Sequence, residues 1–202
     1  MRVDTGFGGR GSGLASSDEE VVMRSTAVPL GVIGFYAVVA SFAFATTAAE
    51  TMLLYPNIFK DIPDSLAQTQ EFMSVVAVGD VMRPMGGALT LCALAAVIVA
   101  LWYRIGRGWL AASLLSLISG QFLLSILYQW PRANILFDDR DKHTRAEIDR
   151  AANEFLVAQG FRIGAALLTA VFAVAAALVC YRARVLAKAR LADDAGLARA
   201  GA

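Results

Sequence analysis

The chain has 202 residues, and its 18 Lys and Arg side chains nearly balance 17 Asp and Glu, giving a formal net charge of +1. Its hydrophobic fraction is 57% and its mean hydropathy is +0.58, whereas soluble domains are typically about 45–50% apolar even with Gly counted. This excess indicates a membrane protein whose partner is the lipid bilayer. The near-neutral charge argues against a nucleic acid partner. Two cysteines in apolar segments and a single histidine give no disulfide framework or metal-ligand spacing, so we expect neither a metal nor a cofactor.

The N-terminal part of the chain combines a polar segment with a long apolar one. Residues 1–24 are rich in Gly and Ser and contain "SDEE", which predicts a disordered tail. Residues 27–49 then carry no charge and exceed the roughly 20 residues that cross the hydrocarbon core as a helix. A signal peptide is the alternative, because "TTAAE" could serve as a cleavage site, but the apolar segment is longer than the usual one.

Three further apolar segments follow, at residues 84–103, 108–130 and 163–181. Only helices satisfy their own backbone in lipid at these lengths. The sequence therefore predicts an all-α, integral membrane four-helix bundle over residues 25–186, with a flexible tail over residues 187–202. Ala88, Cys92, Ala96 and Ala100 form a stripe of small residues in the second span, and Gly160 and Gly164 form a GxxxG pair before the fourth. Both patterns suit ordinary helix packing or, alternatively, a dimer contact.

The connections between the spans are unequal. Residues 104–107 form a tight turn, whereas residues 50–83 and 131–162 are long enough to hold short amphipathic helices. Ser65 with Gln68, and Thr144 with Glu147, match the capping box that begins a helix. In the first connection an apolar face is expected from Leu66, Phe72, Met73 and Val76. In the second, a helix from about Arg145 into the membrane, with Gly160 as a kink, would place Ile148, Ala152, Phe155 and Gln159 on one face.

Basic residues suggest the orientation. Arg24, the turn residues Arg104 and Arg107, and the basic residues after the fourth span lie on one side, which the positive-inside rule makes cytoplasmic. The long connections on the other side also carry basic residues, so the bias is weak. We expect a multi-pass protein of the cell membrane with cytoplasmic termini.

Four polar segments should meet at the other end of the bundle, because alternate span ends share one side. These segments contribute Glu50, Asp80, Arg83, Trp130, Arg132, Asn134 and Arg162. Ionisable groups at membrane depth usually face the bundle interior or a wet cavity, in pairs. Glu50 would pair with Arg162, and Asp80 with Arg83 or Arg132. Either these are interfacial charges and structural ion pairs, or they line a substrate pocket. Gln121, within the third span, suits an interhelical hydrogen bond or the pocket lining.

The same segments carry a family resemblance, in "AAETMLLYPNIFKDIPDSL", "GDVMRPMG", "QWPRANILF" and "EFLVAQGFR". Over roughly residues 30–180 the chain resembles the anthrone oxygenase-like family of small four-helix membrane proteins. That family often has Trp, His or Asn ahead of the last Arg, where this chain has Phe155 and Gln159, so only Arg162 matches there. The resemblance implies oxygenation of a phenolic aromatic without a recognised cofactor.

Such a reaction needs a base, a cation and an apolar slot for flat rings. Glu50 or Asp80 would be the base, and Arg162 and Arg132 would hold the anion. Trp130, Phe59 and Phe137 would form the slot, and Arg83 and Asn134 would contact the same small lipophilic substrate. The alternative is a non-catalytic bundle that binds a small lipophile or serves as an accessory subunit. Either protein could form a homo-oligomer or join a membrane complex.

Overall fold

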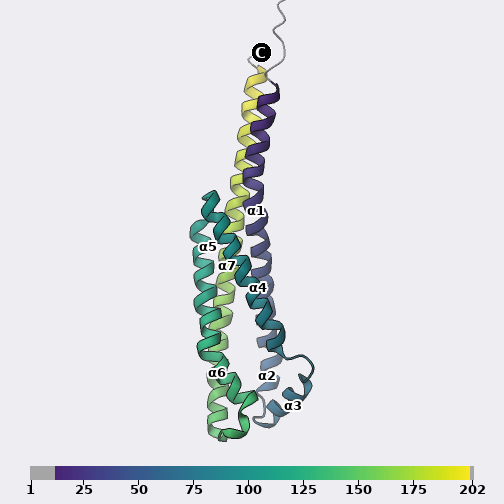
Figure 1. The fold of residues 1–202 in the computed structure, drawn as a ribbon, viewed down its shortest axis with the longest axis vertical. Helices are drawn as coiled ribbons and strands as arrows, with labels where there is room; N and C mark the ends of the chain where they lie inside the picture. Colours follow the sequence, from purple (N-terminus) through teal and green to yellow (C-terminus); the bar gives the residue numbers. More distant parts are fainter. Residues whose placement is uncertain (1–11, 201–202) are drawn as a thin grey trace, which may run out of the picture.

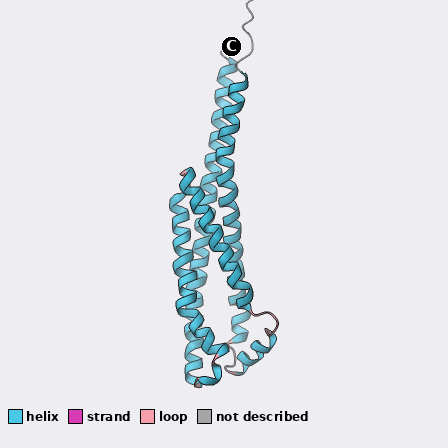
Figure 2. Ribbon diagram, in the orientation of Figure 1, coloured by secondary structure: helices cyan, strands magenta, loops and turns pink. Residues whose placement is uncertain are grey.

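The computed structural model describes residues 12–200, in which the regular elements are all helical (Figures 1 and 2). Residues 1–11 of the predicted N-terminal tail lie outside the described residues, as do residues 201–202. The elements in chain order are α1 (Ser12–Ala49), η1 (Glu50–Leu54), α2 (Tyr55–Ile58), α3 (Asp64–Phe72), α4 (Val78–Tyr103), α5 (Arg107–Ser116), η2 (Leu117–Leu123), η3 (Ser125–Gln129), α6 (Trp130–Ala133), η4 (Asn134–Asp138), η5 (Arg140–Lys142) and α7 (Arg145–Ala200).

Four continuous helices in the described chain are long and apolar enough to cross a membrane, which confirms the predicted number. They cover Ala27–Ile58, Val78–Tyr103, Arg107–Asp138 and Arg145–Asp193. Each contains one predicted span, but three of the four extend well beyond it. The first helix continues past Glu50 and the third past Trp130, because a polar residue ends an apolar segment without breaking a helix. Wider π-helical turns, η1 and η2 to η4, carry the chain through these positions.

Much of the two segments that were predicted as tails is helical. Helix α1 begins at Ser12, and α7 continues without interruption, past Gly160, to Ala200. The residues after 186 are mostly Ala, Leu, Arg and Lys, which are strong helix formers, so a helix there has little local cost. Figure 1 shows α1 and α7 side by side, extending as a pair beyond the turn between α4 and α5.

The turn between α4 and α5 is as tight as predicted. Helix α4 ends at Tyr103 and α5 begins at Arg107. Arg104 and Gly106 adopt left-handed conformations, with φ of 60° and 67°. Glycine reaches such angles without strain, and Gly106 also lies directly against α7, 3.6 Å from Ala176 when a Cβ is built on it.

Small residues form the core of the bundle between α1, α4, α5 and α7. Its buried members include Ala37, Ala40, Ala93, Ala96 and Ala173. The predicted stripe on α4 holds only in part, since Ala96 and Ala100 are buried but Ala88 is exposed. Gly160 and Gly164 are both exposed with open space around them, so the predicted packing role within the bundle is wrong. The close approach occurs instead at Gly120, where a Cβ would lie 2.3 Å from that of Ala165.

Large apolar side chains cover the outer surface of the four long helices. Examples from each helix are Phe35, Leu91, Leu115 and Leu178, which are all more than half exposed. A soluble monomer rarely exposes such extensive apolar surface, whereas lipid tails solvate it at no cost. The distribution fits four membrane spans.

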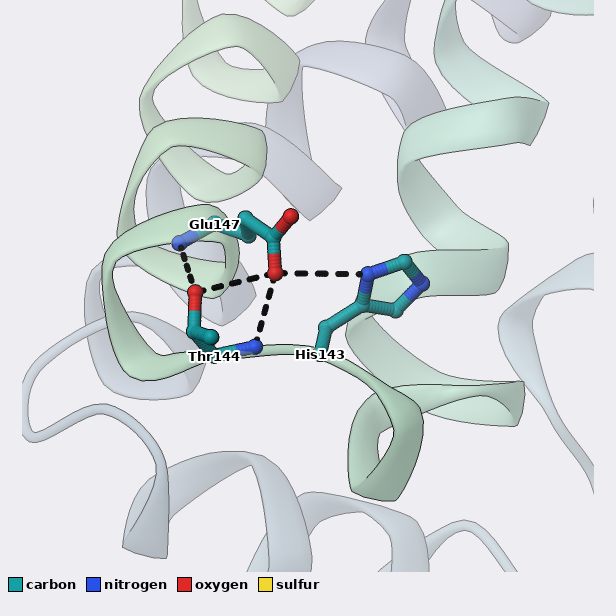
Figure 3. A network of polar contacts seen from close by, with 3 residues as sticks. All are labelled: His143, Thr144 and Glu147. Atoms are coloured by element: carbon teal, nitrogen blue, oxygen red, sulfur yellow. Dashed lines mark hydrogen bonds and ion pairs between the residues drawn. The ribbon is translucent and has the colours of Figure 1, made fainter.

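Helix α7 begins at a capping box, as the sequence predicted. Figure 3 shows the Thr144 backbone N–H and hydroxyl donating to the Glu147 carboxylate at 2.8 and 2.9 Å, while the Glu147 backbone N–H donates to the Thr144 hydroxyl at 3.4 Å. His143 lies beside the same carboxylate, at 3.7 Å. The face predicted for this helix is confirmed, because Ile148, Ala152, Phe155 and Gln159 are all buried.

The capping box predicted for α3 is wrong. Ser65 lies inside the helix and donates to the Ile58 carbonyl at 2.7 Å. Of the apolar face predicted there, Leu66 is buried and Met73 half-buried, whereas Phe72 and Val76 are exposed, because α3 ends at Phe72. Leu66 belongs to a second core, which α2, α3, η4 and the first turns of α7 form below the bundle. The space between the two cores holds the candidate site.

Candidate functional site

A cavity of about 620 Å³ lies between the bundle core and the second core. Its lining comes from all four long helices and from α3. Tyr55 and Phe155 of the second core form part of its wall, and Leu89 and Leu117 of the bundle core form another part. The topology thus brings together the predicted span ends. Eight of the nine predicted site residues line this cavity, namely Glu50, Phe59, Asp80, Arg83, Trp130, Asn134, Phe137 and Arg162.

Glu50 is the buried acid of the cavity, with 6% of its surface exposed. It stands at the first π-helical turn after α1, and such turns often occur at functional sites. Tyr55, one turn further on, donates a hydrogen bond from its hydroxyl to Glu50 Oε1. Within residues 12–200, the other carboxylate oxygen, Oε2, is closed to water and has no hydrogen-bond partner. Such an orphaned buried acceptor is costly, so it needs a functional or structural explanation.

Arg162 brings the opposite charge to the same cavity from α7. Its Nε is also buried without a hydrogen-bond partner in the described part of the chain. The predicted ion pair between Glu50 and Arg162 is not formed, since the ion pairs among the described residues do not include it. Both groups therefore line one cavity while retaining unused hydrogen-bonding capacity.

Asp80 and Arg83 lie on the first turns of α4, and both are exposed. Asp80 Oδ2 accepts a hydrogen bond from the Ala77 backbone N–H at 3.0 Å, which caps the helix. Arg83 lies over the Trp130 ring, 5.5 Å from its centroid, in a cation–π contact between α4 and α6. The predicted pairing of Asp80 with an arginine is therefore wrong. Its carboxylate stabilises the start of α4 instead.

Arg132 is the predicted site residue that the structure does not bring into the cavity. Its Nε donates to Glu154 at 2.9 Å, and its guanidinium lies over the Tyr128 ring at 3.7 Å. The neighbouring positions Trp130, Ala133, Asn134 and Phe137 face the cavity, so Arg132 falls on the other side of the same helix. Its predicted role as an anion holder in this cavity is not supported by its position.

An aromatic cluster beside Glu50 was predicted only in part, since Phe59 was expected in the apolar slot but Tyr55 and Phe155 were not. The Tyr55 and Phe155 rings are 5.4 Å apart edge to face, and Phe59 lies 5.8 Å from Tyr55 and 5.9 Å from Phe155. All three line the cavity. Part of this cluster could be predicted from spacing, because Tyr55 and Phe59 are four residues apart and therefore lie on one face of a helix. Nothing in the sequence pattern relates either of them to Phe155 on α7.

Buried amides tie the helices together next to the cavity. Gln129 donates to Gln159 at 2.8 Å, and Gln159 donates to Thr51 at 2.8 Å. Higher in the bundle Gln121 donates to the Thr169 hydroxyl at 3.0 Å and also lines the cavity, so both predicted roles of Gln121 apply. Gln129 and Gln159 are buried. These bonds hold the cavity walls in fixed positions at the depth where Glu50 stands.

Three acidic residues, Asp138, Asp139 and Asp141, lie just before α7. Asp139 forms an ion pair with Lys142 at 2.6 Å, and this hydrogen bond lowers the pKa of Asp139 and raises the pKa of Lys142. Through residues 12–200, no three His, Cys, Asp or Glu side chains group closely enough to hold a metal ion. His143 is half-buried and contacts Glu147 rather than the cavity.

The site belongs to an all-helical fold whose four long helices could cross a membrane. No family model matches the sequence, and neither a curated protein nor a solved structure is similar to it.

Proposed function

We propose that this chain is a multi-pass membrane protein that binds a lipophilic phenol in the cavity, removes a proton from it and promotes its oxygenation by dissolved oxygen. The observation that carries the proposal is the position of Glu50 and Arg162. A buried carboxylate and a half-buried guanidinium line one cavity of about 620 Å³, and each retains a buried polar atom without a hydrogen-bond partner among the described residues. This volume lies in the usual range for small-molecule sites, about 300–1,000 Å³.

Glu50 is a better candidate for the base than Asp80. Asp80 is exposed and its Oδ2 is committed to the start of α4. Glu50 is buried among the aromatic rings, and the Tyr55 hydroxyl fixes one of its oxygens. Its other oxygen, Oε2, has no hydrogen-bond partner among the described residues and is therefore free to take up a proton from a bound phenol.

The reaction follows from these groups. The acidic C–H of an anthrone-type phenol transfers its proton to Glu50, and the guanidinium of Arg162 stabilises the enolate oxygen. The carbanion gives one electron to oxygen, and the resulting radical pair joins to form a C–O bond. The peroxide then recovers the proton from Glu50. Loss of water from this hydroperoxide leaves a ketone, so one CH₂ and one O₂ become one C=O and one H₂O.

The non-catalytic alternative differs in what it requires of the charges. A structural bundle or an accessory subunit would be favoured by full pairing of every buried charge and by a filled interior. The cavity and the orphaned atoms of Glu50 and Arg162 favour ligand handling instead. A protein that binds a small lipophile without catalysing a reaction would use the same cavity. An activity measurement is needed to distinguish this binding role from the enzymatic one.

We also propose the location. The four apolar helices support a position in the cell membrane, and the basic residues Arg104, Arg107, Arg182 and Arg184 support cytoplasmic termini. The cavity mouth then faces the opposite side. Cysteine accessibility tests this orientation, because a Ser74→Cys variant is expected to react with a membrane-impermeant reagent added from outside intact cells.

The test of function is oxygen consumption by purified protein with a panel of hydroxyanthrones. The wild type is expected to exceed the spontaneous rate. Glu50→Gln should lower the catalysed rate by about 10²–10⁴, the usual contribution of a general base. Glu71→Gln, which alters an exposed acid on α3 outside the cavity, is the matched control and should keep full activity. A folded wild type that never exceeds the spontaneous rate would refute the enzymatic proposal.

A further inference from the structure

The cavity is long and has chemically different ends. On α4 its lining extends from Val78 to Thr90, a separation of twelve positions that corresponds to about 18 Å of helix. The end near the connections is polar, with Asp80 and Arg83 opposite Asn134 and Asp138. The other end, in the middle of the span, is lined largely by apolar groups, among them Leu89, Leu117 and Phe122. This shape suits an amphiphile with a polar head and an apolar body.

One side of the cavity is bounded by two helices that diverge. Helix α4 packs closely against α1 and α5, whereas no comparable packing joins it to η2 or η3. Figure 1 shows α4 crossing away from the helix that begins with α5, toward the end that carries α2 and α3. The cavity lining includes residues from both sides of this divergence, with Gly86 and Gly87 on α4 and Phe122 and Ile126 on the other helix.

Gly86 and Gly87 have no packing explanation. Both are exposed, both line the cavity, and a Cβ built on either meets no atom within 4 Å. Gly120, by contrast, is required by its contact with Ala165. Each glycine within a helix costs about 0.5–1 kcal/mol relative to Ala, so two adjacent ones without a close neighbour suggest that the space itself is used.

A contact between α4 and α6 lies between the polar end of the cavity and the glycine pair. Arg83 on α4 reaches over the Trp130 ring, 5.5 Å from its centroid, and so bridges the two helices about one turn from Gly86 and Gly87. On one side of this bridge lie the polar residues Asp80, Asn134 and Asp138. On the other side lies the glycine pair, at the depth of the apolar spans.

We infer that the cavity has a lateral entrance between α4 and the helix of residues 107–138, at Gly86 and Gly87, through which an alkyl-substituted phenol enters directly from the bilayer. This inference rests on the proposed function for the identity of the ligand, and adds its class and its route. A phenol with a long alkyl chain partitions into the bilayer, so a membrane-facing slot gives it access without a passage through water. The polar head then lies near Arg83 and Arg162, and the chain near Leu117 and Phe122.

The test compares entry of two probes into protein reconstituted in vesicles. Trp130 serves as the fluorescent reporter after Trp102→Phe and Trp109→Phe remove the other two tryptophans. 4-Nonylphenol is delivered from preloaded vesicles, and 4-methylphenol from water. Gly87→Leu should narrow the entrance, and Ile126→Phe should narrow it from the opposite wall without adding a second tryptophan. Gly164→Leu, at an exposed glycine of α7 outside the cavity, is the matched control.

For Gly87→Leu we expect association of nonylphenol to slow by about tenfold or more, while that of methylphenol stays within about twofold, because only the first probe depends on the lateral route. Ile126→Phe should give the same selective effect, so the entrance can still be tested if Gly87→Leu fails to fold. Equal slowing of both probes, or none, in a folded variant would overturn the lateral entrance and leave the cavity proposal standing. Failure of the unsubstituted cavity to bind either probe would instead overturn the proposed function.

Discussion

Replacing Glu50 by Gln should make the protein more stable while it abolishes catalysis. Glu50 is 6% exposed, and its Oε2 has no hydrogen-bond partner within the described residues. The base role requires the ionised carboxylate, which is the form that burial penalises most. An amide of the same shape keeps the acceptor for the Tyr55 hydroxyl but carries no charge.

The magnitude follows from two opposing terms. Leaving a buried acceptor unsatisfied costs about 1–3 kcal/mol, and more when it is charged, so neutralising it should recover at least part of that cost. The bond from Tyr55 weakens, since hydrogen bonds to charged groups contribute about 1.5–3 kcal/mol and neutral ones about 0.5–1.5 kcal/mol. Recovering about 1–3 kcal/mol while losing about 1 kcal/mol leaves a net gain of up to about 2 kcal/mol, which corresponds to an increase of up to about 8 °C in Tm for a chain of this length.

The chain supplies its own reporter for this measurement. Cys180 is 1% exposed whereas Cys92 is half-buried, so after Cys92→Ser a thiol-reactive fluorogenic dye labels Cys180 in detergent only as the bundle unfolds. Glu71→Gln is the control for charge removal at an exposed position and should leave Tm unchanged. If Tm of Glu50→Gln falls below that of the wild type, the unpartnered Oε2 of Glu50 does not destabilise the fold, and the reasoning that leads from this oxygen to the base role fails.

Three further predictions concern the membrane and the charges. The protein should stay in the membrane fraction after carbonate extraction because its four long helices expose apolar surface, and its release would refute the spans. Gln159→Leu should lower Tm, since it leaves the buried Gln129 amide N–H without its acceptor, at about 1–3 kcal/mol, and removes the bond that the Thr51 hydroxyl accepts, whereas Gln68→Leu on exposed α3 should have little effect. Arg162→Ala should lower Tm more than Arg145→Ala, because Arg162 is the cation beside buried Glu50, and equal melting would contradict this.

Much of the fold could be predicted because hydropathy and capping are local properties. The four apolar segments, the turn at residues 104–106 and the start of α7 at Arg145 all depend on neighbours in the chain. The helix extensions were missed because a charged residue such as Glu50 ends a hydrophobic segment without ending a helix. Similarly, Gly and Ser in the first 24 residues, and the polar residues after 186, suggested tails where α1 and α7 in fact continue as helices.

The sequence predicted at which end of the bundle the candidate site lies, but not how its side chains pair. Alternation of spans brings Glu50, Asp80 and Arg162 together, and the structure confirms that shared location. Pairing was not predictable, because it depends on the rotation of each helix about its axis. Arg132 illustrates this dependence. It is only two residues from Asn134, which lines the cavity, but its side chain forms an ion pair with Glu154 outside the cavity.

The length of α7 has a mechanical consequence. It is an unbroken helix of 56 residues, and it carries Arg162 at the cavity and ends at Ala200. The 38 residues between these two positions correspond to about 57 Å of helix at 1.5 Å per residue. A rigid rotation of about 5° about Arg162 therefore displaces the far end by about 5 Å, which is close to the one-turn step of about 5.4 Å known from helix movements in regulated proteins. A small adjustment of α7 around a bound molecule is thereby converted into a large displacement at the opposite end of the protein.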